Sequence, residues 1–218
     1  MAPAWAFNHT EAAVPLLPVR RARPRAILSV AHADRSSAAR TKDGRLNETD
    51  YSRLVALEAG ATLTALGVDF AVIEQPSLED KVEVVNEIAA AGGALCAVEA
   101  HLNADDGSGD PGFRGTMTLY EKDDEQDRAL AVEIADELAA ALPWTKSWDV
   151  EPAPGRMVHR KKIAFLADTR IPCAMPELLF LSCPREAEWL LHPNSPAILG
   201  AAVARGIFRF LLPHQLRP

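Results

Sequence analysis

Apolar residues along the chain fall into short runs separated by longer segments with helical spacing. Three of these runs predict buried strands, at 26–31, 68–74 and 94–100. Two helices are predicted between them. The first begins after the N-cap candidate Asn47, with Asp50 as its capping-box partner, and the second spans 78–91. Gly67 ends the first helix, and a Gly-Gly pair ends the second.

The second half of the chain continues the alternation. Its elements are predicted to be a strand at 116–120, an amphipathic helix at 124–142, a strand at 163–166 and an apolar run at 173–181. Two helices, at about 184–191 and 196–211, close the chain. Strands that alternate with helices predict a single α/β domain with a twisted, mostly parallel sheet flanked by helices.

Composition narrows the class of protein. The chain has 218 residues, enough to bury about 70% of its unfolded surface without a disulfide or metal. Lys and Arg number 23 against 30 Asp and Glu, and a net charge of −7 argues against nucleic-acid binding. No run of 18 apolar residues occurs, so no membrane span is expected. The three cysteines include no CxxC pair, and Cys173, with no His nearby in sequence, is predicted to be a small buried hydrophobe.

The N-terminal segment 1–25 differs from the rest. It contains four prolines and predicts an extended arm in front of a domain at 26–218. Glu11 interrupts its apolar part, and its arginines follow that part instead of preceding it, so no signal peptide is predicted. We therefore expect synthesis in the cytoplasm. A second segment with Pro and Gly, 144–157, predicts a loop.

Polar side chains stand where the predicted strands end. Ligands of open α/β sheets bind beyond the C-terminal ends of the strands. His32 follows the first strand, His101 follows the third, and Glu177 interrupts the late apolar run. Glu48 lies in the first turn of the helix after the first strand. Two imidazoles and a carboxylate with an open fourth position form a hydrolytic zinc site, and a further carboxylate can act as general base.

Each of these residues also has a structural interpretation. His32 and His101 could be core histidines that hydrogen-bond to the backbone. Glu48 could complement the helix dipole. Glu177 is costly to bury without a partner, and an arginine such as Arg170 could pair with it. The residues by themselves leave these alternatives open.

Four stretches carry a family resemblance: 28–32 (LSVAH), 47–51 (NETDY), 98–104 (VEAHLNA) and 171–182 (IPCAMPELLFLS). In order and spacing, from about residue 26 to 212, the chain resembles the zinc-dependent N-acetylmuramoyl-L-alanine amidases, which are cell-wall hydrolases. Two departures stand out. Ala33 and Asp34 follow His32 where the family usually has two glycines, and Glu99 stands where the family has a serine.

The resemblance implies that His32, Glu48 and His101 hold a zinc ion and that Glu177 is catalytic. It makes 26–218 a zinc amidase domain that cleaves the amide between N-acetylmuramic acid and L-alanine, with peptidoglycan as its partner. Asn103 is a candidate for substrate binding, with loop capping as the alternative.

Two other functions are compatible with the same residues. One is a zinc amidohydrolase that acts on a small N-acyl amino acid, and the other is a non-catalytic module that binds the cell wall. A wall hydrolase without an export signal would resemble an endolysin released by a phage or prophage. The oligomeric state is not predicted.

Overall fold

The computed structural model describes residues 25–35, 37–104, 114–121, 123–146 and 163–215. The predicted arm lies outside the described residues except for its last residue, and so does the predicted loop from residue 147 onward. The remaining chain forms one five-stranded sheet with the strand order β2-β1-β3-β5-β4. Its strands are β1 (Ala26–Val30), β2 (Phe70–Ile73), β3 (Cys96–Asn103), β4 (Met117–Leu119) and β5 (Cys173–Phe180).

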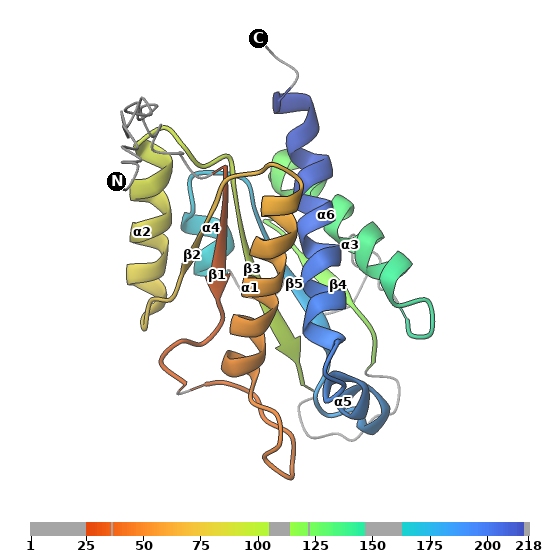
Figure 1. Ribbon diagram of the computed structural model, residues 1–218. Coiled ribbons are helices and arrows are strands. Elements are labelled where there is room, and N and C mark those ends of the chain that lie inside the picture. The colour runs from red at the N-terminus through yellow and green to blue at the C-terminus, as the bar shows by residue number, and fades with distance from the viewer. Residues whose placement is uncertain (1–24, 36, 105–113, 122, 147–162, 216–218) are drawn as a thin grey trace, which may run out of the picture.

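All neighbouring strands run parallel except β4, which pairs antiparallel with β5 at the sheet edge. Helices lie on both faces (Figure 1). They are α1 (Glu48–Ala65), α2 (Leu78–Ala90), α3 (Glu125–Ala141), α4 (Ala164–Asp168), α5 (Pro184–Leu190) and α6 (Ser195–Gln215). The larger core packs α1, α3 and α6 on one face, and a smaller core packs α2 and α4 on the other. The predicted α/β class and mostly parallel sheet are confirmed.

The local signals that start the helices act as expected. The side chain of Asn47 accepts a hydrogen bond from the backbone N–H of Asp50, and Ser77 and Asp124 cap α2 and α3 in the same way. Gly67, just past α1, has a φ of 72°, a conformation that an L side chain adopts only with strain. The first turn of α1 lies beside the end of β1, where the Thr49 hydroxyl donates to the carbonyl oxygen of His32.

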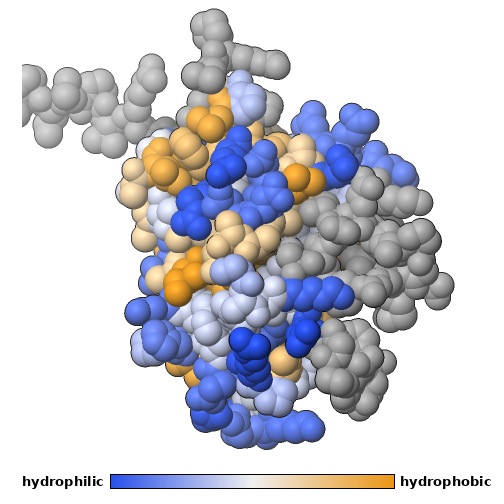
Figure 2. Space-filling model, turned by 90° about the vertical axis from the view of Figure 1, so that its right-hand side faces the viewer, coloured by the Kyte–Doolittle hydropathy of each residue, from blue (hydrophilic) through white to orange (hydrophobic). Residues whose placement is uncertain are grey.

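Helix α6 is the central apolar helix of the larger core. Its segment Ser195–Pro213 has a mean hydropathy of 1.4 and is long enough to cross a membrane, but it packs against α1 and α3. A core helix needs the same composition. On the face shown in Figure 2, apolar groups lie among hydrophilic ones.

Two predictions about the elements are wrong, one about the type of an element and one about where a strand ends. The segment predicted as a strand at 163–166 begins the short helix α4, since a four-residue apolar run fits a buried helix turn as well as a strand. The third strand does not end before His101. It continues to Asn103 because β5 pairs with it from Ala97 to Asn103, with a shift of register between His101 and Asn103. His101 therefore lies within a strand and not in the loop after it.

The close packing of α6 predicts a steric effect at Gly206. A Cβ atom there would lie 2.5 Å from the Cα of Ile134 and 2.9 Å from the carbonyl oxygen of Glu133, both backbone atoms of α3. We expect Gly206→Ala to lower the free energy of unfolding by about 1–3 kcal/mol through overpacking. This loss would occur although alanine favours an exposed helix by about 1 kcal/mol over glycine. Denaturant unfolding measures the change.

The control for this variant is Ala197→Gly, at an exposed position of the same helix, which reports helix propensity without the packing. A Gly206→Ala protein more stable than the parent would contradict the close approach of α6 and α3.

Candidate metal centre

One face of the sheet changes from apolar to polar along its strands. Ile27, Ala97 and Cys173 belong to the smaller core under α2 and α4. Because side chains alternate along a strand, residues two and four positions further point to the same face. On β1 and β3 these are Ser29, Glu99 and His101, and on β5 Glu177 lies in register with His101. The C-terminal half of this face therefore carries the polar groups.

His32 lies in the turn that follows β1. Its φ of 47° is left-handed, a strained conformation for a residue with a Cβ atom. Its carbonyl oxygen accepts hydrogen bonds from the Thr49 hydroxyl and the Arg35 backbone N–H, both at 2.7 Å. The tight turn thus forms although Ala33 and Asp34 stand where the proteins that the sequence resembles usually have two glycines. The imidazole Nδ1 lies 2.6 Å from the hydroxyl of Ser37, which leaves Nε2 to face the site.

Glu48 brings a buried carboxylate to the same place from the first turn of α1. It is 3% exposed. Its Oε2 accepts from the backbone N–H of Ala39 at 2.8 Å, and its Oε1 accepts from that of Leu102 at 3.2 Å. Burial, the largest single effect, would raise its pKa, but the hydrogen bond with His101, the charge of that ring and the backbone N–H of Ala39 together outweigh burial and hold the pKa below its ordinary value. Glu48 is therefore ionised and fixed in one orientation.

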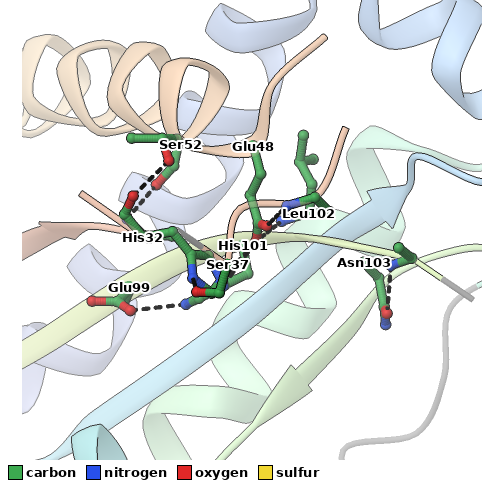
Figure 3. Close-up of polar contacts among 12 residues, drawn as sticks. His32, Ser37, Glu48, Ser52, Glu99, His101, Leu102 and Asn103 are labelled. Carbon is green, nitrogen blue, oxygen red and sulfur yellow. Dashed lines mark hydrogen bonds and ion pairs between the residues drawn. The ribbon is translucent and has the colours of Figure 1, made fainter. Parts of the chain in front are cut away.

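His101 lies between two carboxylates (Figure 3). Its Nδ1 is 3.0 Å from Glu48 Oε1, and its Nε2 is 2.8 Å from Glu99 Oε1. Burial by itself lowers the pKa of His101, but the hydrogen bonds to both carboxylates outweigh burial and raise the pKa to about 10. The ring meets that of His32 edge to face, with centroids 4.9 Å apart.

The structure brings three of the predicted ligands together. Ligand atoms of His32, Glu48 and His101 all lie within 4.8 Å of one another. Glu48 Oε1 is the shared neighbour, 3.5 Å from His32 Nε2 and 3.0 Å from His101 Nδ1. Two imidazole nitrogens and a carboxylate oxygen suit a borderline divalent cation. The cluster can hold a metal ion after small shifts of these side chains.

Glu177 lies beside this cluster. Burial raises its pKa to about 7, although the positive charge of His101 opposes the shift. A carboxyl group that titrates near neutrality is suited to accept and return a proton. Within the described residues no ion pair joins Glu177 to Arg170, whose backbone N–H instead donates to Asn86. The catalytic role of Glu177 stays a prediction.

The other candidates have ordinary surroundings. Asn103 is half-buried at the end of β3, and its side-chain oxygen accepts from the N–H of Ala104, so its substrate role stays a prediction. Cys173 is buried beside Asp127, as predicted for a small core residue, and burial raises the pKa of its thiol.

Two buried charged residues next to the cluster of His32, Glu48 and His101 are not predicted from the sequence. They are Glu99 and Lys81. In the sequence Glu99 stands out only as a departure from the family pattern, although its position two residues before His101 places it on the same face of β3. Nothing in the sequence indicates that Lys81 is buried, because a lysine in the first turns of an amphipathic helix is normally solvated. Here it is 4% exposed and its Nζ lies 2.6 Å from Glu99 Oε2.

Comparison with known proteins identifies the family. The model of the N-acetylmuramoyl-L-alanine amidase family matches residues 27–209, and the chain belongs to this family. The match covers the sheet except the first residue of β1, the helices α1 to α5, α6 as far as residue 209, and the residues His32, Glu48, Glu99, His101 and Glu177. A search of curated proteins found no match.

Solved structures of cell-wall amidases share the fold. The CwlD amidase of Clostridioides difficile, solved with the GerS lipoprotein, is 25% identical with a TM-score of 0.69 over 85% of this chain and 97% of its own. The amidase Ami1 of Mycobacterium smegmatis is 22% identical, and AmiC2 of Nostoc punctiforme is 19% identical. Both have a TM-score of 0.71 and align over 87% of this chain and 97% of theirs.

The geometry predicts that Glu48 is a metal ligand and not merely a helix-terminal carboxylate. We expect Glu48→Gln to weaken Zn²⁺ binding strongly while most of the stability remains, because the amide keeps one acceptor but loses the charge. A helix-dipole role predicts the reverse, a stability loss of about 0.3–1 kcal/mol with metal binding intact. Zinc titration and thermal unfolding of the same protein distinguish the two.

His32→Ala and His101→Ala serve as comparison variants and should also lower the bound zinc. A full equivalent of zinc in either histidine variant, measured by elemental analysis, would show that the ligands are assigned wrongly.

Proposed function

We propose that this protein is a zinc-dependent peptidoglycan hydrolase that cleaves the amide between N-acetylmuramic acid and L-alanine. The observation that carries the proposal is the convergence of His32 Nε2, Glu48 Oε1 and His101 Nδ1 in a chain of the amidase family. Three protein ligands with an open fourth position are typical of hydrolytic zinc sites, whereas structural sites are closed by four. A non-catalytic wall-binding module would have no need of such a site.

Zinc, when bound, supplies a Lewis acid that polarises the scissile carbonyl and lowers the pKa of water. His32, Glu48 and His101 would hold it from three different elements. Backbone N–H groups of Ala39 and Leu102 keep the carboxylate of Glu48 in place, and Ser37 orients the ring of His32.

Glu177 would handle the protons of the reaction. Its side chain shares a sheet face with His101, and its pKa of about 7 allows both protonation states near neutral pH. As a general base it would take the proton from the attacking water. As a general acid it would then deliver that proton to the nitrogen of the leaving L-alanine.

Digestion of purified sacculi tests the activity and the bond. We expect new N-terminal L-alanine to appear, detectable by dinitrophenylation, and the reaction to stop with a chelator and resume on addition of Zn²⁺. His101→Ala is the control for metal-independent contaminants. New reducing sugar ends would instead indicate a glycosidase. Intact sacculi together with hydrolysis of N-acetyl amino acids would favour the small-substrate alternative.

The role of Glu177 makes a second prediction. Glu177→Gln is nearly isosteric and can still hydrogen-bond, but it cannot accept the water proton. We expect kcat to fall at least about 100-fold, within the range of about 10²–10⁴ for general acid–base groups. Zinc content and the unfolding midpoint should stay close to those of the parent.

Glu87→Gln, at an exposed position on α2, is the matched loss of one negative charge and should keep full activity. A loss smaller than about tenfold per folded, zinc-loaded molecule of Glu177→Gln would exclude the proton-transfer role, because it falls short of the general acid–base range.

A further inference from the structure

Behind His101, on the side away from Glu48, lies a buried charged chain made of Glu99 and Lys81. We propose that Glu99, held in place by Lys81, is a positioning residue for the metal site: it accepts the Nε2–H of His101 and thereby reserves Nδ1 of that ring for the cation. This inference rests on the proposed function, since it concerns how the same site binds its metal.

The distances support a directed contact. Glu99 Oε1 lies 2.8 Å from His101 Nε2, while Glu99 Oε2 accepts from the Ser29 hydroxyl at 2.5 Å and from Lys81 Nζ at 2.6 Å. Lys81 Nζ also donates to the carbonyl oxygen of Val30 at 3.1 Å. The two carboxylate oxygens of Glu99 therefore bind different partners. Oε1 contacts the imidazole of His101, and Oε2 contacts Ser29 on β1 and Lys81 on α2.

The burial of these groups argues for a role beyond stability. Lys81, Glu99 and His101 are 4%, 3% and 8% exposed. Lysine and glutamate are almost never fully buried, and a buried ion pair is frequently no more stable than apolar residues of similar volume. Stability alone therefore does not require charged residues at these two positions. A carboxylate that accepts the N–H of the second ring nitrogen of a ligating histidine orients the ring and raises its basicity toward the metal, which apolar residues cannot do.

His32 provides an internal comparison. Its ring is also held at the nitrogen that faces away from the site, but by the hydroxyl of Ser37, and its side chain is 27% exposed. A hydroxyl can either donate or accept, so it selects neither tautomer. An ionised carboxylate only accepts. Of the two histidines, His101 is the one whose nitrogen on the side away from Glu48 faces a group that can only accept, so that nitrogen keeps its proton when a cation occupies Nδ1.

The experiment measures zinc affinity in Glu99→Gln, by competition with a chromophoric chelator. The amide has one oxygen, and both Ser29 and Lys81 donate toward it, so its NH₂ group turns toward His101 and no longer accepts from Nε2. We expect a loss of roughly 10–100-fold in zinc affinity. The visible absorption of the Co²⁺-loaded protein should change as well, because the imidazole is no longer held in one orientation.

Glu137→Gln is the matched control. Glu137 is also a buried carboxylate, 7% exposed, but it pairs with Arg205 and Arg209 between α3 and α6. Both variants should lose stability, because Glu137→Gln leaves two arginines and Glu99→Gln leaves a lysine without a charged partner. Only Glu99→Gln should also lose zinc affinity. Equal zinc affinity and an unchanged Co²⁺ spectrum in Glu99→Gln would overturn the proposal.

A double variant covers the case in which Glu99→Gln does not fold. Lys81→Met with Glu99→Leu replaces the pair by apolar residues and leaves no unpaired charge. We expect this protein to fold with near-parental stability and to show the same roughly 10–100-fold loss of zinc affinity. Zinc binding within threefold of the parent would overturn the positioning role alone. A parent that binds no zinc would overturn the proposed function itself.

Discussion

The buried carboxylate of Glu48 is the constraint on which the rest of the site depends. A carboxylate can be buried only if its charge and its lone pairs are satisfied. Glu48 meets this condition with the backbone N–H groups of Ala39 and Leu102 and the ring of His101. These partners belong to the loop after β1 and to β3, so the loop, the strand and the helix must all be in place together. Metal ligands are thereby positioned by the fold and not by their own flexibility.

The framework behind Glu48 reaches into the larger core. Tyr51, one turn further along α1, donates to the Ser195 hydroxyl at 2.7 Å, and Ser195 donates to the carbonyl oxygen of Leu190. The start of α1 is therefore joined to the start of α6 and the end of α5. Helix α6 packs closely enough on α1 that a Cβ at Gly200 would lie 2.7 Å from the backbone nitrogen of Ala59. Apolar packing on one face of the sheet thus holds the helix that supplies a ligand.

The other face shows how one set of strands can serve as both core and site. Ile27, Ala97 and Cys173 are packed under α2 and α4, and further along this face come Ser29 on β1, Glu99 on β3 and, after the apolar Met175, Glu177 on β5. Helix α2 follows this change, since Val85 lies in the apolar core while Lys81, one turn earlier, pairs with Glu99. The site consequently lies against a close-packed interior, and such an interior allows the side chains of the site little movement.

The sequence by itself determined the α/β class, the helix caps and the identity of the residues that cluster. Periodicity and capping act locally, so Asn47 and Gly67 could be interpreted without knowledge of the fold. His32 and His101 stand out because ligands of α/β sheets bind at the ends of strands, and Glu48 because it begins the helix after the first strand. Glu177 stands out because a carboxylate in an apolar run is costly to bury without a partner. The residues alone leave open whether His32 and His101 are metal ligands or core histidines, and only the resemblance to the amidase family favours ligands.

Only the tertiary structure decided the rest, because the deciding interactions join residues distant in sequence. Pairing with β5 extends β3 through His101 to Asn103, and packing against α2 makes 164–168 a helix where a short apolar run predicted a strand. The contact of Lys81 with Glu99 spans two elements that no local pattern connects. Which nitrogen of each imidazole faces the site likewise follows from partners brought together by the sheet.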